Sequence, residues 1–272
     1  MNNKKRQFTD EELIRRVTDI EEIRNLTARR AYYYINGMHK RELDELWVQE
    51  PEHQHTASFG RNWGYKVGMD SIRRYYVNEY ESNIAGKCGI MEWQPISTPQ
   101  FELAGDGKTA RVLWYSSGQR TEPDTSGQPL ANWSFEKMGI DYIKEAGGWK
   151  IWHLAIATEL YYQVGIDYAS IPPEIGLGDT PFEAEFGVPD ISMLTHDVRL
   201  NWCDNYPPQP EPYDTFDVKH SYAPEGHPNY QKPDYVFNHR FGGKCHWIEL
   251  ELTDLQKENG DPSGYWTFEN GR

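Results

Sequence analysis

A histidine inside a predicted strand is the first candidate for proton transfer in this sequence. His153 lies in an apolar run at residues 149–164, and strand alternation would place it on the same side as Trp149 and Ile151. An imidazole among apolar side chains needs a hydrogen-bond partner, and its surroundings can move its pKa across neutrality. His153 is therefore a candidate general acid or base, and a purely structural histidine is the alternative.

Two further histidines stand two residues apart, in a segment that alternates like a strand over residues 53–59. On such a strand His53 and His55 would point the same way, which is also a geometry for metal ligands. A metal site needs a third ligand, and no Cys, Asp or Glu nearby completes a recognised zinc spacing, so no metal is predicted. We interpret His55 as a catalytic candidate and His53 as a substrate-binding candidate, with a position at the rim of a pocket as the alternative.

Tyr34 and Arg30 form a third candidate group. They lie four residues apart and share one face of a predicted helix. A phenol can donate to a developing oxyanion, and a guanidinium can hold a carboxylate or a phenolate. In the alternative, Arg30 pairs with an acid at the rim and Tyr34 only packs.

The predicted strands also carry candidates for substrate binding. Trp114 and Tyr115 lie on a β-rich run, and Asn132 lies on the next strand. Alternation alone does not decide which of the two aromatic residues faces a pocket. No Gly-x-Ser-x-Gly elbow, phosphate loop or dinucleotide fingerprint is present, which disfavours nucleophilic serine and nucleotide chemistry.

Composition narrows the class of protein. The chain of 272 residues has a net charge of −14, which argues against nucleic acid or an anionic membrane as a partner. Its three widely spaced cysteines do not suggest a disulfide framework. No apolar run reaches membrane-spanning length and no signal-peptide pattern is visible, so we expect a cytoplasmic protein.

The elements that would position the candidates follow an α+β order. Thr9 and Glu12 form a capping box for a helix at residues 11–35, with an apolar stripe along one face. Short helices at residues 40–47 and 69–80 flank the strand predicted at residues 53–59. Strands at about residues 91–103, 109–119, 131–144 and 149–164 then form an antiparallel meander. The stripe on the first helix comprises Leu13, Val17, Ile20, Ile23, Thr27, Ala31 and Tyr34.

The sequence changes character after residue 164. Twelve of the 17 prolines lie in residues 165–272, together with many aromatic residues. This content is too aromatic for a disordered linker. We therefore divide the chain into a domain at residues 1–164 and an irregular C-terminal extension, in which residues 244–253 are the best candidate strand. The extension is expected to pack on the domain or on a neighbouring subunit of a homo-oligomer, a dimer or a trimer.

Several short motifs share an order with a known family. They include Asn36-Gly37, Leu46-Trp47, Gly68-x-x-x-Ile72 and Gly148-Trp149-Lys150-Ile151-x-His153, preceded by Ile23-Arg24-x-Leu26-x-Ala28-Arg29. The pattern resembles the SnoaL-like branch of the NTF2-like superfamily over residues 10–164. The resemblance implies a cone-shaped α+β barrel whose helices pack into a curved antiparallel sheet around an apolar pocket. It also implies enzymes that need no cofactor, such as dehydratases, isomerases and the gamma-formaldehyde lyases that act on lignin dimers.

The sequence departs from this family at the end of the first helix. Many family enzymes carry an aspartate there, whereas this chain has Ile35 beside Tyr34. We therefore expect a lyase of the dehydratase or formaldehyde-eliminating type rather than a ketosteroid-type isomerase. Its substrate would be a small aromatic compound, consistent with a role in aromatic catabolism. The alternatives are a non-catalytic binding or assembly module and a metal-dependent enzyme using His53 and His55.

Overall fold

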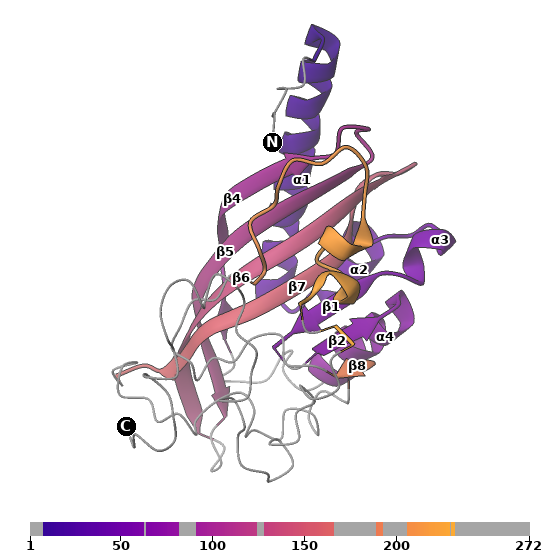
Figure 1. Ribbon diagram of the computed structural model, residues 1–272. Coiled ribbons are helices and arrows are strands. Elements are labelled where there is room, and N and C mark those ends of the chain that lie inside the picture. Colours follow the sequence, from indigo (N-terminus) through magenta and orange to yellow (C-terminus); the bar gives the residue numbers. More distant parts are fainter. Residues whose placement is uncertain are drawn as a thin grey trace, which may run out of the picture.

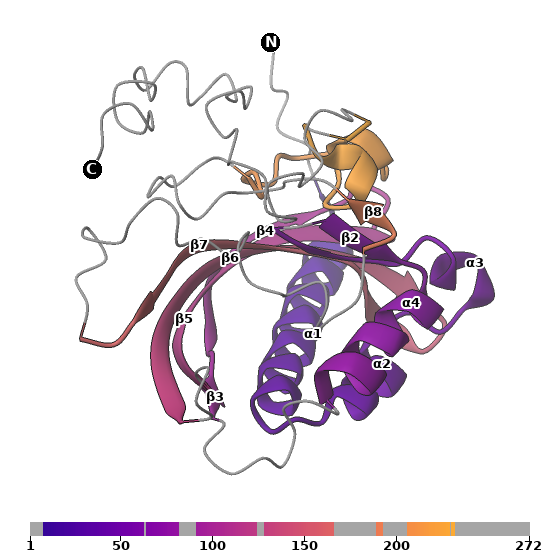
Figure 2. The same ribbon diagram turned by 90° about the horizontal axis from the view of Figure 1, so that it is seen from below.

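The computed structural model describes residues 8–62, 64–81, 91–123, 128–165, 189–192, 206–228 and 230–231. Its longest helix, α1 (Asp10–Ile35), lies against the concave face of a curved sheet (Figure 2). The predicted capping box is confirmed, because the Glu12 amide donates to Thr9 Oγ1 at 3.2 Å and the Thr9 amide donates to Glu12 Oε2 at 2.8 Å. These bonds satisfy amides that the first turn of a helix leaves without partners.

The predicted apolar stripe on α1 is wrong for its first turns. Leu13 and Val17 are 47% and 61% exposed, because this end of the helix extends beyond the sheet (Figure 1). Burial begins at Asp19 and Ile23 and continues to Tyr34. Only the second half of α1 is therefore available to form the interior of the fold.

Shorter helices, α2 (His39–Leu46) and α4 (Met69–Arg73), lie on the same side of the sheet as α1 (Figure 2). The π-helix η1 (Arg74–Glu81) follows α4 directly, and α3 (Pro51–Gln54) lies beside the edge of the sheet (Figure 2). The prediction of one strand over residues 53–59 is wrong, because α3 occupies its first part and β1 begins only at Ser58. Pro51 stands at the start of α3, where its fixed φ and missing amide suit the first turn of a helix.

The sheet has eight strands in the order β3-β5-β6-β7-β1-β2-β8, and β4 also pairs with β5. The predicted meander is present, and its pairs are antiparallel. The sheet is nevertheless mixed and open, since β1 runs parallel to β7. The strands are β1 (Ser58–Arg61), β2 (Gly64–Val67), β3 (Glu92–Trp93), β4 (Ile96–Leu103), β5 (Thr109–Pro123), β6 (Pro129–Glu145), β7 (Gly148–Gln163) and β8 (Ile191–Ser192).

Two bulges interrupt the pairing of β6 with β7. Tyr142 pairs with Ile151 but Asp141 pairs with His153, which leaves Trp152 as an extra residue. Glu159 is the extra residue at the second bulge, between Thr158 and Leu160. Each extra residue shifts the alternation of the strand, so side chains beyond a bulge change faces.

Residues 206–228 of the C-terminal extension lie on the convex face of the sheet, opposite α1 (Figure 2). β8 pairs with β2, and Tyr206 and Tyr222 pack with Tyr65 and Ala155. Two 3-10 turns, η4 (Val218–His220) and η5 (Pro224–Gly226), lie in the same segment. The strand predicted at residues 244–253 lies outside the described residues.

The core lies between α1 and the concave face. It includes apolar side chains from the helices and from the central strands, among them Ile23, Leu43, Leu46, Trp47, Phe59, Ile72, Trp114, Ile140, Ile151 and Leu154. The architecture is the α+β fold expected from the sequence. No helix in the described part of the chain is long and apolar enough to cross a membrane.

Candidate active site

Tyr34, in the last turn of α1, lies between the buried Arg30 and the partly buried Arg61. Its hydroxyl oxygen accepts a hydrogen bond from Arg61 Nη2 at 3.3 Å. The guanidinium carbon of Arg30 lies 5.3 Å from the centre of the tyrosine ring. Burial raises the pKa of the Tyr34 hydroxyl well above its ordinary value, so this group stays protonated at physiological pH. A protonated phenol beside a guanidinium can donate to an oxygen that gains negative charge.

Arg61, at the end of β1, also binds a carboxylate on the sheet. Its Nη1 lies 2.9 Å from Glu136 Oε1, and the two side chains are 11% and 4% exposed. The same glutamate oxygen accepts from Thr158 Oγ1 at 3.3 Å and from Ser134 Oγ at 3.4 Å. These three donors therefore converge on one of the two carboxylate oxygens.

The other oxygen, Glu136 Oε2, is buried and accepts no hydrogen bond from the residues that the structure describes. A buried acceptor left in this state costs about 1–3 kcal/mol, and such groups in native proteins often serve catalysis or ligand binding. Tyr34, Arg61 and Glu136 thus bring together a hydrogen-bond donor, a fixed positive charge and an acceptor. We call these three residues the Tyr34 triad.

A second ion pair lies deeper in the fold. Arg30 Nε is 3.2 Å from Glu42 Oε1, with side chains that are 1% and 0% exposed. Arg30 Nη2 also donates to the Tyr76 hydroxyl, and Trp47 Nε1 donates to Glu42, both at 3.3 Å. Burial raises the pKa of Glu42, although Arg30 and Trp47 act in the opposite direction. Because this pair is fully enclosed, it is suited to holding α1 against α2 rather than to meeting a substrate.

His39 completes the polar interior. Its ring lies 5.2 Å from that of Tyr34 and 5.5 Å from that of Tyr76. Burial, followed by the charge of Arg30, lowers the pKa of His39 to about 4. The imidazole is therefore neutral at pH 7 and can both donate and accept a hydrogen bond.

The prediction that His153 shares a face with Ile151 is wrong. The extra residue Trp152 turns His153 to the convex face, where its Nδ1 lies 3.0 Å from Asp141 Oδ2. Asp141 also accepts from Arg111 Nε at 3.2 Å and from the amide of Tyr222 at 2.7 Å. His153 thus belongs to a buried network beneath the C-terminal extension, on the side of the sheet away from Tyr34.

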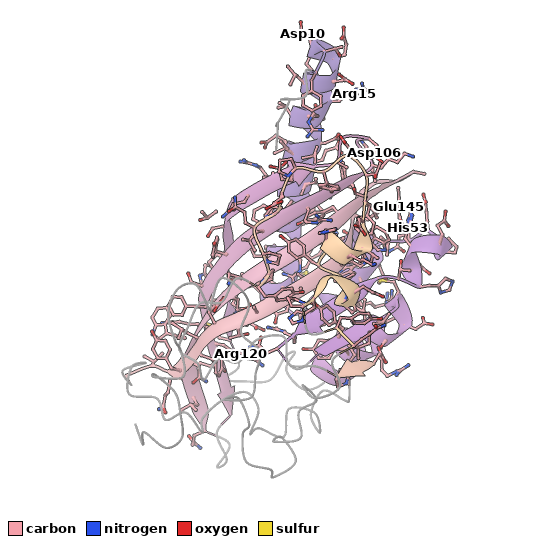
Figure 3. The ribbon with its side chains drawn as sticks, viewed as in Figure 1. Asp10, Arg15, His53, Asp106, Arg120 and Glu145 are labelled. Atoms are coloured by element: carbon pink, nitrogen blue, oxygen red, sulfur yellow. The ribbon has the colours of Figure 1, made fainter. Side chains whose placement is uncertain are left out.

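The expected pairing of His53 with His55 on one strand is also wrong. Both residues lie in or just after α3, and His55 is exposed at its C-terminal end. His53 is half-buried, with its Nδ1 2.9 Å from Glu145 Oε1. Figure 3 shows His53 and Glu145 close together, well separated from Arg120 on the far part of the sheet.

The predicted binding residues divide between the two faces. Trp114 faces the core and donates from Nε1 to the Tyr142 hydroxyl at 3.2 Å, whereas Tyr115 points to the convex face and is 39% exposed. Asn132 is buried on the same face of β6 as Glu136. Asn132 and Trp114 therefore lie on the side of the Tyr34 triad, and Tyr115 does not.

Sequence reasoning named Tyr34 and Arg30 as candidates. It did not name Arg61, Glu136, His39 or Glu42, which the structure places near them. One signal for Glu136 was available: Asn132, Ser134 and Glu136 occupy alternate positions of a predicted strand. Three polar residues on one face of a strand in the middle of a sheet indicate a polar interior. No comparable pattern marks Arg61, because its partners lie 27 and 75 residues away.

The chain matches the model of a known protein family. Residues 15–155 match the model of the SnoaL-like domain, about half of the chain, and the chain belongs to this family. No curated protein matches the chain.

Several solved structures are similar to the chain. One is a protein assigned as a dehydratase of the NTF2-like family from Streptomyces avermitilis. It is 15% identical, the match covers 53% of this chain and 98% of that chain, and the TM-score is 0.44. Another, assigned as a scytalone dehydratase from Novosphingobium aromaticivorans, has 10% identity, coverage of 57% and 94%, and a TM-score of 0.44. LinA has 10% identity, coverage of 58% and 98%, and a TM-score of 0.44.

Proposed function

We propose that this SnoaL-like protein is a cofactor-independent lyase that eliminates water or formaldehyde from a small aromatic substrate. The observation that carries the proposal is the unsatisfied buried oxygen of Glu136 beside the hydrogen-bonded pair of Tyr34 and Arg61. A protein that only held an apolar ligand would gain nothing from burying these groups, because each costs free energy to remove from water. An elimination, in contrast, needs both a base and a stabiliser of oxygen charge.

Each member of the Tyr34 triad then has a chemical role. In a dehydration, Glu136 Oε2 accepts the proton from the carbon next to the leaving hydroxyl, the C–H electrons form the new C=C bond as the C–O bond breaks, and Glu136 returns the proton to the hydroxyl so that water leaves. In a loss of formaldehyde, Glu136 takes the proton of a hydroxymethyl group, the C–C bond breaks, and the proton returns to the carbon that loses this group. Tyr34 donates a hydrogen bond to the substrate oxygen on which charge develops, and Arg61 stabilises that charge. Arg30 and His39 act as positioning residues, because both contact the ring of Tyr34.

The aromatic substrate class rests on the rings around this site. Phe59 lies 5.1 Å from Tyr75 and 5.0 Å from Tyr76, centre to centre, and Tyr76 lies next to His39. Aromatic side chains favour offset or edge-to-face contacts with one another and with a planar ligand. Trp114 and Asn132 lie on the same side of the sheet as these rings.

A substrate panel tests the proposal. Wild-type protein is mixed with hydroxylated phenylpropanoids and hydroxylated bicyclic aromatics, and released water-elimination products or formaldehyde are measured by mass spectrometry and a formaldehyde assay. Turnover that disappears in Glu136→Gln, with binding retained, supports an elimination lyase. Tight binding of a panel compound with no turnover by the wild type would overturn it in favour of a binding module.

We also propose that the protein forms a homo-oligomer through the exposed end of α1. Leu13, Ile14 and Val17 are 47%, 67% and 61% exposed on adjacent turns of this helix. Contiguous apolar side chains in water favour association. Light scattering of the wild type and of Ile14→Glu tests this, and a monomeric wild type would contradict it.

A further inference from the structure

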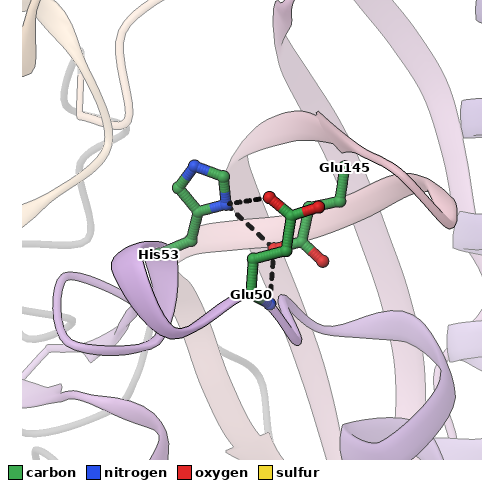
Figure 4. Close-up of side chains that lie close together, drawn as sticks. All are labelled: Glu50, His53 and Glu145. Atoms are coloured by element: carbon green, nitrogen blue, oxygen red, sulfur yellow. Dashed lines mark hydrogen bonds and ion pairs between the residues drawn. The ribbon is translucent and has the colours of Figure 1, made fainter.

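Three potential metal ligands meet outside the Tyr34 triad, where α3 approaches the hairpin between β6 and β7 (Figure 4). They are Glu50, His53 and Glu145, and we call them the Glu50 cluster. His53 Nδ1 lies 2.9 Å from Glu145 Oε1 and 3.8 Å from Glu50 Oε2. One ligand atom from each residue lies within 4.8 Å of the others. The cluster joins residues 92 positions apart in the chain.

These spacings suit a tetrahedral metal ion. Zinc binds histidine nitrogen and carboxylate oxygen at about 2.0–2.2 Å, which places ligand atoms about 3.4 Å apart at tetrahedral corners. The two observed distances of 2.9 and 3.8 Å lie on either side of that value. Small rotations of the Glu50 and His53 side chains, which are 34% and 20% exposed, would equalise them.

The two carboxylates of the cluster carry negative charge that a bound cation would neutralise. Among the residues that the structure describes, neither Glu50 nor Glu145 forms an ion pair with a lysine or an arginine. The Glu145 side chain is 2% exposed, and a carboxylate buried without a positive partner is costly. A divalent ion bound to both carboxylates would neutralise them together.

Backbone amides already orient the carboxylates. The amides of Gln49 and Glu50 donate to the two oxygens of Glu145 at 2.9 and 3.1 Å. The amide of Ala146 donates to Glu50 Oε1 at 2.9 Å, which leaves Glu50 Oε2 directed toward His53. Such outer contacts fix ligands in place and reduce the entropy lost on metal binding.

We infer that the Glu50 cluster binds a divalent transition-metal ion of the zinc class. One imidazole with two carboxylates favours zinc, cobalt or manganese over calcium and magnesium, which prefer sites made only of oxygen. The ion links the connection between α2 and α3 to the end of the β6–β7 hairpin. It stabilises the fold and takes no part in the proposed elimination.

The experiment uses untagged, full-length protein stripped with a chelator and then dialysed. Isothermal titration with zinc chloride, repeated with manganese chloride, measures affinity and stoichiometry. Thermal melting with and without zinc provides a second readout, since an ion that binds only the folded state raises Tm. We expect one zinc per chain, and a rise in Tm of about 5 °C or more at a hundredfold excess over Kd.

Variants assign the site. Loss of an outer contact weakens metal binding by about 10–100-fold. His53→Ala and Glu50→Gln each remove a ligand, so each should weaken zinc binding by more than this. His55→Ala and Glu52→Gln alter exposed residues of the same segment and should bind zinc like the wild type. Glu50→Gln removes only a charge from a partly exposed side chain, so it remains informative if His53→Ala fails to fold.

Wild-type protein that binds no zinc at millimolar concentration would overturn the inference. Binding that is equally weakened by His55→Ala, or unaffected by His53→Ala and Glu50→Gln, would overturn it as well. These outcomes are independent of the proposed elimination, because none of them depends on turnover.

Discussion

Arg61 Nη2 lies 3.3 Å from the hydroxyl oxygen of Tyr34, although the two residues belong to different elements, β1 and α1. The parallel pairing of β1 with β7 brings Arg61 to this position, since Ser58 aligns with His153 and Gly60 with Ala155. The same arginine reaches Glu136 on β6. One guanidinium therefore connects the phenol and the carboxylate on which the proposed chemistry depends.

Tyr34→Phe tests the phenol. The change removes the hydroxyl and keeps the ring, so we expect turnover to fall by the equivalent of about 2.7–4 kcal/mol in the activation barrier, with Tm nearly unchanged. Tyr33→Phe is the matched control, because the Tyr33 hydroxyl bonds Glu45 rather than Arg61. Full activity of Tyr34→Phe, with Tm lowered only in Tyr34→Ala by a cavity costing about 3–5 kcal/mol, would make Tyr34 a packing residue.

Glu136→Gln tests the base. An amide keeps the size of the side chain but cannot take a proton, so we expect kcat to fall about 10²–10⁴-fold. Glu159→Gln is the control, since Glu159 is a buried carboxylate that pairs with Lys137. Steady-state kinetics and circular dichroism on both variants make the comparison. Wild-type kcat in a folded Glu136→Gln protein would remove the glutamate from the mechanism.

His153→Ala should impair stability rather than turnover. The substitution removes one partner of the buried Asp141 carboxylate, and we expect the free energy of unfolding to drop by about 1–3 kcal/mol. Denaturant unfolding measures this loss, and kinetics of the remaining folded protein should match the wild type. His55→Ala, at an exposed position, should change neither quantity. A stable variant that has lost turnover would restore His153 as a catalytic residue.

The stability of the protein should depend on pH through His39. Its folded pKa is about 4, below the ordinary value of 6.5, because burial and Arg30 disfavour the charged form. As the pH falls from about 6.5 to 4, His39 therefore takes up a proton in the unfolded chain but stays neutral in the folded chain. Over that window His39 removes about 3 kcal/mol of stability, which is restored above pH 6.5.

Urea unfolding at pH 4.5 and pH 7 measures this effect. His39→Gln carries no titrating group, so its stability should fall less between the two pH values than that of the wild type. His55→Gln serves as the exposed control and should retain the wild-type difference. An identical difference in His39→Gln and the wild type would contradict the assignment.

Gly139→Ala tests the attachment of the C-terminal extension. A Cβ at this position would collide with the ring of Tyr222, which lies directly over the convex face. We expect overpacking to cost about 1–3 kcal/mol and to reduce amide protection in residues 206–228, as measured by hydrogen exchange. Gly147→Ala, where the nearest atom is a lysine carbon at 4.0 Å, is the control. Unchanged protection in Gly139→Ala would show that the contact with Tyr222 is dispensable.

The amino-acid sequence alone determined the local elements of the domain. The capping box at Thr9 set the start of α1, and alternation with turn glycines marked the strands of the meander. Periodicity also placed Tyr34 and Arg30 on one helix face, because i and i+4 are neighbours on any α-helix. These features depend on residues only a few positions apart, so a linear pattern records them.

The tertiary structure decided which side chains meet. One extra residue in β7, Trp152, turns the side chain of His153 away from the interior. The alternation of apolar and polar residues along a strand does not reveal where such a bulge occurs. The partners Arg61 and Glu136 are 75 residues apart, and Arg30 pairs with Glu42 only because α2 folds back beside α1. Buried charges must find partners wherever the chain brings them together, and this condition depends on the packing of the whole fold.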